Sequence, residues 1–102
     1  MTFVNFQIGA IARLLRALHQ NAETYQVAIE VIGHEEQPWA SATFAGHRLR
    51  LTLALGGGDR QCWLSALPQA ELPVRGAFVA DLHVEHRTED TARVAILLID
   101  DA

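Results

Sequence analysis

The chain has 102 residues, of which half are apolar and 20% are charged. Its eight basic residues, all arginine, against twelve acidic ones leave a formal net charge of −4. This size and balance predict a single folded domain over residues 1–102 rather than a disordered tail. The arginines are scattered along an acidic chain, so we expect neither nucleic acid nor an anionic membrane surface as a partner.

The only cysteine is Cys62, so no disulfide can form within the chain. The absence of an intrachain disulfide suits a protein of a reducing compartment. Residues 1–5 lack the pattern of a secretory signal, and the longest aliphatic run, Val94–Ile99, is far shorter than the roughly 20 residues that span a bilayer. We therefore expect a cytoplasmic protein in which Cys62 is a small buried residue rather than a nucleophile.

The first regular segment is a predicted helix over residues 7–20. Its apolar residues recur at spacings of four and three, which places them on one helical face. Asn5 is the predicted N-cap and Asn21 the predicted end. The members of the apolar stripe are Val4, Ile8, Ile11, Leu15 and Leu18.

Three strands are then predicted, over residues 25–31, 39–45 and 48–55, because apolar residues alternate there with polar ones. Residues 34–38 are predicted to be a polar turn, and residues 45–47 a tight connection. Gly56–Gly58 stop the third strand. Asp59 is the predicted N-cap of a short helix over 60–67, whose apolar stripe is Trp63, Leu64 and Leu67.

The last two predicted strands, over residues 75–87 and 92–100, are joined by a turn at 88–91. The element order is therefore α-β-β-β-α-β-β. We expect an α+β fold in which an antiparallel sheet of about five strands carries helices on one face. This order is similar to that of the small acidic dimeric chaperones of bacterial type III secretion. The resemblance is one of topology, without a shared motif, and implies a chaperone-like accessory subunit as one possible function; no residue roles follow from it.

The final strand is apolar on both faces. Val94, Ile96 and Leu98 point one way, whereas Leu97 and Ile99 point the other way, together with Ala95 and Arg93. A strand that is apolar on both sides is usually buried on both sides. One possibility is that another subunit covers the second face, which predicts a homodimer with these residues at the interface. The alternative is that the chain covers this face itself, with its own helix and its N-terminal arm, residues 1–6.

A polar row on the preceding strand is the main candidate for chemistry. Asp81, His83 and Glu85 are predicted to share one face with Arg87. Two carboxylates beside an imidazole could orient a general base or supply mixed nitrogen and oxygen ligands to a metal. The favoured alternative is a solvated sheet face in which these groups pair with Arg48 and Arg50 on neighbouring strands.

The sequence contains no complete catalytic or cofactor motif. Gly56–Gly58 precede a helix, but the P-loop lysine and the dinucleotide-binding glycine pattern are absent, and the five histidines lack zinc-site spacing. We therefore predict no catalytic residues, metal or cofactor. The sequence favours a small protein-interaction or accessory binding module acting as a homodimer. The alternative is a small enzyme or a ligand- or metal-binding protein that uses the face of Asp81, His83 and Glu85.

Overall fold

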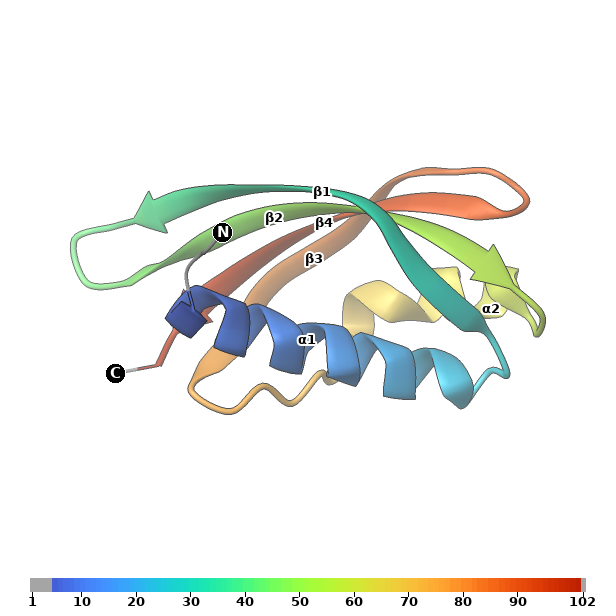
Figure 1. The fold of residues 1–102 in the computed structure, drawn as a ribbon, viewed down its shortest axis with the longest axis horizontal. Coiled ribbons are helices and arrows are strands. Elements are labelled where there is room, and N and C mark those ends of the chain that lie inside the picture. Colours follow the sequence, from blue (N-terminus) through green and yellow to red (C-terminus); the bar gives the residue numbers. More distant parts are fainter. Residues whose placement is uncertain (1–4, 102) are drawn as a thin grey trace.

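The computed structural model describes residues 5–101, and for residues 5–8 it describes the backbone alone. Within this range four strands form one antiparallel sheet in the order β1-β2-β4-β3, accompanied by two α-helices (Figure 1). The predicted α+β class is confirmed, but the described chain has four strands rather than five, in the order α-β-β-α-β-β. The elements are α1 (Asn5–Glu23), β1 (Ala28–Ala40), β2 (Ala45–Gly56), α2 (Arg60–Ala66), a 3-10 turn (Leu67–Gln69), β3 (Ala77–Arg87) and β4 (Thr91–Asp100).

The prediction of a turn at residues 34–38 is wrong, because these residues continue β1 as an edge strand. Glu35 lies opposite Arg50 of β2, and Pro38 lies opposite His47. Proline is tolerated on an edge strand, where one row of backbone amides has no strand partner. The segment is polar because this end of the β1–β2 hairpin extends past α1 and adds little to the core (Figure 1).

The connection between these strands lies at residues 41–44, not at the predicted 45–47, which belong to β2. The backbone N–H of Ser41 donates to the carbonyl oxygen of Phe44 at 2.7 Å. The Ser41 hydroxyl in turn accepts from the N–H of Phe44 at 3.1 Å. This local hydrogen bonding closes the hairpin, so the two predicted short strands before residue 46 are in fact one long strand and one turn.

Helix α1 buries a stripe that is shifted from the predicted one. Leu18 is buried as predicted, whereas Leu15 and Ile11 are only partly buried. The small side chains of Ala17 and Ala22 face the core with Leu14 and let the helix pack closely on the sheet. The predicted roles of Val4, Asn5 and Ile8 fall outside the described side chains.

Helix α2 follows its prediction closely. Its N-cap Asp59 accepts a hydrogen bond from the backbone N–H of Cys62 at 3.1 Å, and the three predicted stripe residues are buried. The buried Trp63 donates its indole N–H to the side-chain oxygen of Asn21 at 2.9 Å, which links α2 to α1. Cys62 is exposed, so its predicted burial is wrong: the helical phase that buries Trp63 and Leu64 turns Cys62 outward.

The connection before α2 packs tightly against the turn after α1. Gly58 has φ +54°, and a Cβ atom there would overlap the carbonyl oxygens of Tyr25 and Gln26. The N–H of Asp59 donates to the same Tyr25 carbonyl at 3.1 Å. Glycine is therefore required at position 58 both for its backbone conformation and for this close approach.

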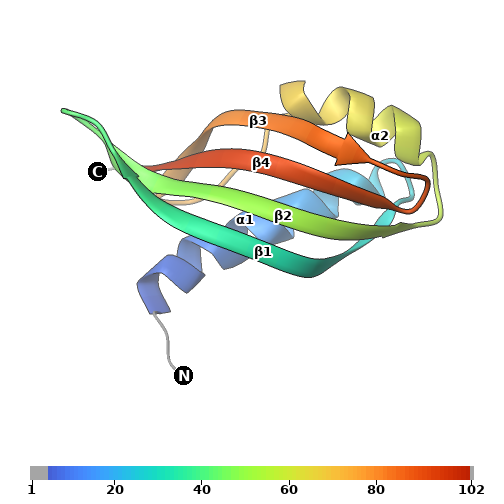
Figure 2. The same ribbon diagram turned by 90° about the horizontal axis from the view of Figure 1, so that it is seen from above.

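Both helices lie on one face of the sheet, which we call the inner face (Figures 1 and 2). The opposite face, the outer face, has no helix over it in residues 5–101. The core fills the space between the helices and the inner face, where alternate residues of the two central strands are buried: Leu49, Leu51, Leu53 and Leu55 of β2, and Ala92, Val94, Ile96 and Leu98 of β4. None of the helices in the described range is long and apolar enough to cross a membrane.

The two edge strands carry irregularities that reset which side chains face outward. Ile32 of β1, and Ala80 and Glu85 of β3, are extra residues in the pairing with the neighbouring strand. Each is a β-bulge, after which the alternation of faces starts again. The central pair, β2 and β4, is in continuous register from Gly46 opposite Ile99 to Ala54 opposite Thr91.

Candidate functional site

Charged side chains of three strands gather in a shallow groove on the outer face. The groove has a volume of about 150 Å³, and its floor is formed by Ala95 and Leu97 of the central strand β4. We call it the charged groove. It brings together all five residues that the sequence singled out as a polar face, together with one that it did not: Arg48, Arg50, Asp81, His83, Glu85 and Glu35.

Arg50 is the centre of this cluster. It reaches over Ala95 to Glu85 of β3, with Nε 2.8 Å from Oε1 and Nη2 3.2 Å from Oε2. Its Nη1 also donates to Glu35 of β1 at 3.3 Å. The small side chain of Ala95 leaves room for this bridge between strands that are not neighbours in the sheet. The paired guanidinium holds the pKa of Glu85 below its ordinary value, mainly through the hydrogen bond.

His83 lies between two carboxylates but makes no close hydrogen bond to either. Its Nδ1 is 3.5 Å from Asp81, and its Nε2 is 3.8 Å from Glu85. The side chains of His83 and Asp81 are more than half exposed. A general base needs an imidazole held at hydrogen-bond distance, and here the Glu85 oxygen that faces His83 is already engaged by Arg50. Among the described residues, no three His, Cys, Asp or Glu side chains are grouped to hold a metal ion.

The bulge at Glu85 explains why Arg87 is absent from the groove. The sequence predicts that Arg87 shares a face with Asp81 and His83, but the extra residue moves it to the opposite side. Arg87 is paired with the buried Ala92 and donates to the side-chain oxygen of Gln61 on α2 at 2.8 Å. Side chains from Asp81 to Glu85 therefore alternate between the two faces of the sheet as predicted, and this alternation is broken at the bulge.

An apolar row crosses the outer face beside the charged groove. Trp39, Gly46, Ile99 and Phe78 lie opposite one another on the four strands. The ring of Phe44, in the hairpin turn, meets Phe78 edge to face, with centroids 6.2 Å apart. Ile99 is buried, whereas Phe44 and Phe78 are 51% and 42% exposed. Sequence reasoning missed this row, because it depends on register across four strands.

The predicted interface residues of the last strand divide between the two faces. Val94, Ile96 and Leu98 belong to the core, so the chain itself covers them. Leu97 and Ile99 point to the outer face: Leu97 is partly exposed at the floor of the charged groove, and Ile99 lies in the apolar row. The N-terminal arm invoked as an alternative cover falls largely outside the described residues.

Comparison with protein-family models, with curated proteins and with solved structures gives no significant match to this chain. Its function is therefore argued from the outer face and from the surface of the helices alone.

Proposed function

We propose that the protein is a small protein-interaction module that acts as a homodimer, in which two copies associate through their outer faces. The observation that carries this proposal is the apolar row lying next to the charged groove on a sheet face that no described helix covers. Exposed aromatic side chains rimmed by polar ones are typical of protein interfaces.

A second copy of the chain suits this face because its free charges are self-complementary. Arg48, Leu97 and Asp81 lie opposite one another on β2, β4 and β3. A two-fold axis that lies between the two outer faces, above Leu97 and parallel to β4, places Arg48 of each copy against Asp81 of the other. Within residues 5–101 Arg48 has no ion-pair partner, and Asp81 has only the distant His83. A two-fold interface requires this kind of self-matching surface.

A ligand-binding or enzymatic role for the charged groove is the second candidate, supported by the convergence of Asp81, His83 and Glu85. The groove holds about 150 Å³, which is below the roughly 300 Å³ at which ligand pockets begin. Arg50 also occupies part of the acidic row through its pair with Glu85. The dimer is therefore the stronger proposal.

The first test is the mass of the protein in solution, measured by light scattering behind size exclusion near micromolar concentration. We expect about twice the 11.2 kDa mass of the chain. Leu97→Asp should give a folded monomer, because it places a carboxylate at the centre of the interface. The control Ala12→Asp changes an exposed residue of α1, on the opposite side of the sheet, and should leave the mass unchanged. A monomeric wild type, or a dimeric Leu97→Asp, would contradict the proposal.

A charge exchange tests the two-fold pairing directly. Arg48→Asp and Asp81→Arg should each weaken the dimer, because each variant opposes like charges across the axis. The double variant should recover most of the wild-type affinity, since the attraction is restored with the signs reversed. If the double variant dissociates as readily as the single ones, Arg48 and Asp81 do not face each other in the dimer.

A further inference from the structure

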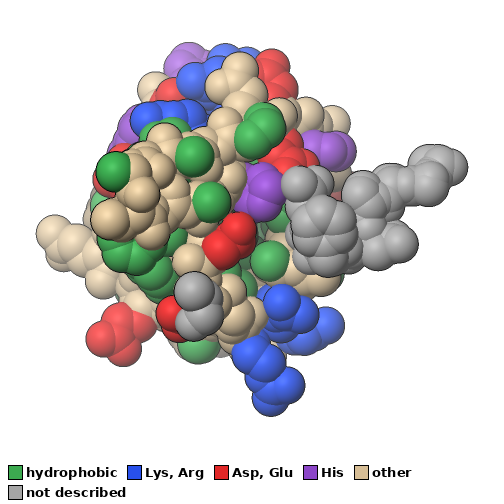
Figure 3. Space-filling view, turned by 90° about the vertical axis from the view of Figure 1, so that its left-hand side faces the viewer, with side chains coloured by type: hydrophobic (Ala, Val, Ile, Leu, Met, Phe, Trp, Pro, Cys, Tyr) green, Lys and Arg blue, Asp and Glu red, His purple; other side chains and the backbone are tan. Residues whose placement is uncertain are grey.

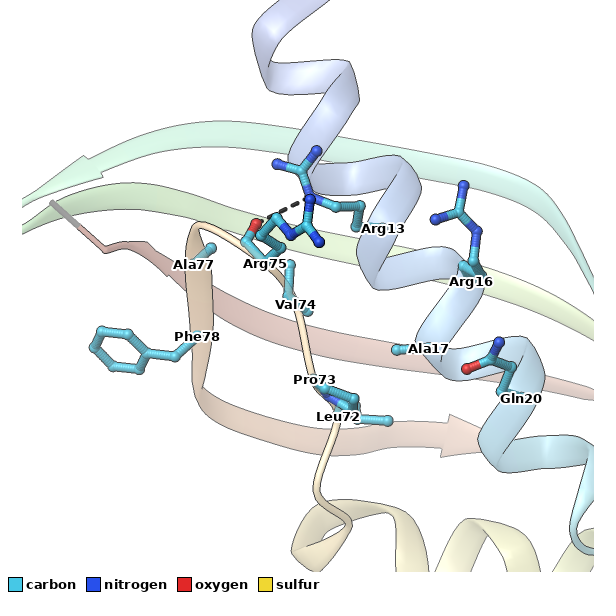
Figure 4. A pocket seen from close by; sticks show the side chains of 10 residues that line it. All are labelled: Arg13, Arg16, Ala17, Gln20, Leu72, Pro73, Val74, Arg75, Ala77 and Phe78. Atoms are coloured by element: carbon cyan, nitrogen blue, oxygen red, sulfur yellow. Dashed lines mark hydrogen bonds between the residues drawn. The ribbon is translucent and has the colours of Figure 1, made fainter.

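A second, larger groove lies on the helix side of the molecule, between α1 and residues 72–78. Its volume is about 720 Å³, which falls within the range of ligand pockets. Arg13 and Arg16 of α1 line one wall, and Arg75 stands on the opposite segment (Figure 4). We call it the arginine groove. Its apolar part includes Leu72, Pro73 and Val74, and Phe78 points away from the arginines.

Arg13 is held in place at the edge of this groove. Its Nε donates to the backbone carbonyl of Arg75 at 2.9 Å, across 62 residues of sequence. Two glycines flank the terminal nitrogens: a Cβ at Gly9 would lie 3.5 Å from Nη1, and a Cβ at Gly76 would lie 3.7 Å from Nη2. The hydrogen bond therefore uses Nε, and within the described residues neither terminal nitrogen makes a hydrogen bond.

The charge of the groove is unbalanced. Three of the eight arginines of an acidic chain line it, and no acidic residue of the described part of the chain does. None of the three forms an ion pair with a carboxylate within residues 5–101, whereas Arg50 on the outer face has two acidic partners. In Figure 3 arginine side chains project at the bottom of the view, on the helix side, and acidic side chains lie to their left. Neighbouring like charges repel each other, and a bound anion would remove that cost.

We propose that the arginine groove binds a small organic phosphate monoester. Guanidinium groups bind phosphate through paired, charge-assisted hydrogen bonds, and the three of them more than balance the double negative charge of a phosphate monoester. The apolar wall of Leu72, Pro73 and Val74 would contact the organic part of the ligand. A dicarboxylate has the same charge, so the test separates the two kinds of anion.

The test is a titration of the full-length 15N-labelled protein with phenyl phosphate at constant ionic strength, followed by NMR. Saturable shifts are expected at the Nε–H groups of Arg13, Arg16 and Arg75. Arg16→Gln should raise the dissociation constant at least about tenfold, since the variant loses a hydrogen bond between charged groups. Arg16 makes no described hydrogen bond that its loss would disturb. The control Arg93→Gln removes the same charge from the outer face and should change affinity less than about twofold.

Succinate, titrated in the same way, distinguishes the anions. Much weaker binding of succinate supports the phosphate monoester, whereas equal or tighter binding overturns that assignment in favour of a carboxylate. Shifts that do not saturate, or an equal loss of affinity in Arg93→Gln, would show general charge screening and overturn the site itself. The groove lies on the opposite side of the sheet from the proposed dimer interface, so Leu97→Asp should bind phenyl phosphate as the wild type does.

Discussion

The two faces of the sheet are built from the same strands, yet they differ in what covers them. On β4, Val94 points to the inner face and is completely buried under the helices, whereas Leu97 points outward and stays partly exposed. Apart from His47, the buried residues of β2 and β4 on the inner face are apolar, whereas the outer face mixes an apolar row with paired charges. The comparison shows that the helices, rather than the hydrophobicity of a residue, decide which side of a doubly apolar strand becomes core.

The largest expected effect comes from truncating matched leucines on the two faces. Leu53→Ala should lower the free energy of unfolding by about 3 kcal/mol, because it removes a fully buried side chain and leaves a cavity. In the monomer, at a protein concentration below that of dimerisation, Leu97→Ala should cost less, about 1–2 kcal/mol, because part of its side chain is exposed there. Urea unfolding at one protein concentration measures both. Equal losses would mean that Leu97 is as well covered as the core.

The tight packing on the helix side gives the next effect. Gly58→Ala should destabilise the fold by about 1–3 kcal/mol, since position 58 combines a left-handed backbone with contact to two carbonyl oxygens. Gly56→Ala is the matched control, because a Cβ there would meet no atom within 4 Å. Thermal unfolding of the two variants provides the measurement. Similar midpoints would show that the connection before α2 adapts freely.

A smaller loss is expected from the bond between the helices. Asn21→Ala leaves the buried indole N–H of Trp63 without its partner and should cost about 1–2 kcal/mol. In the background of Trp63→Phe, which has no N–H to satisfy, the same change should cost clearly less. This double-mutant cycle isolates the hydrogen bond, and additive losses would argue against it.

The smallest effect concerns the outer face and depends on pH. The Arg50 hydrogen bond lowers the pKa of Glu85, so the folded state holds its carboxylate charged more firmly than the unfolded state does. This stabilisation is present above the unfolded pKa, about 4.3, and is lost as the pH falls through the lower folded value. In Glu85→Gln the free energy of unfolding should therefore fall less steeply as the pH is lowered below about 4.3. Near neutral pH the substitution should change that free energy very little. An unchanged acid limb would mean that the pair contributes nothing in solution.

The features that the sequence predicts well are those set by neighbouring residues. Leu49, Leu51, Leu53 and Leu55 alternate along β2, and Asp59 caps α2, because period and capping are local properties. The bulges at Ile32 and Glu85 are not visible in this way, since they depend on how a partner strand is paired. For the same reason the sequence predicts two short segments where β1 is one strand, and predicts the wrong face for Arg87. The arginine groove joins residues 62 apart in sequence, and no spacing rule brings Arg13 to Arg75.

The position of the three bulges has a consequence for how the protein behaves when it is concentrated. All of them fall on β1 and β3, the two strands whose outer edges have no neighbour in the sheet. A long, regular free edge invites another chain to add a strand, which is a route to fibrous aggregates, and bulges interrupt the row of amides that such a strand would need. The fold thereby discourages growth along its edges while leaving the outer face open, and the dimer that we propose through that face would be a closed pair.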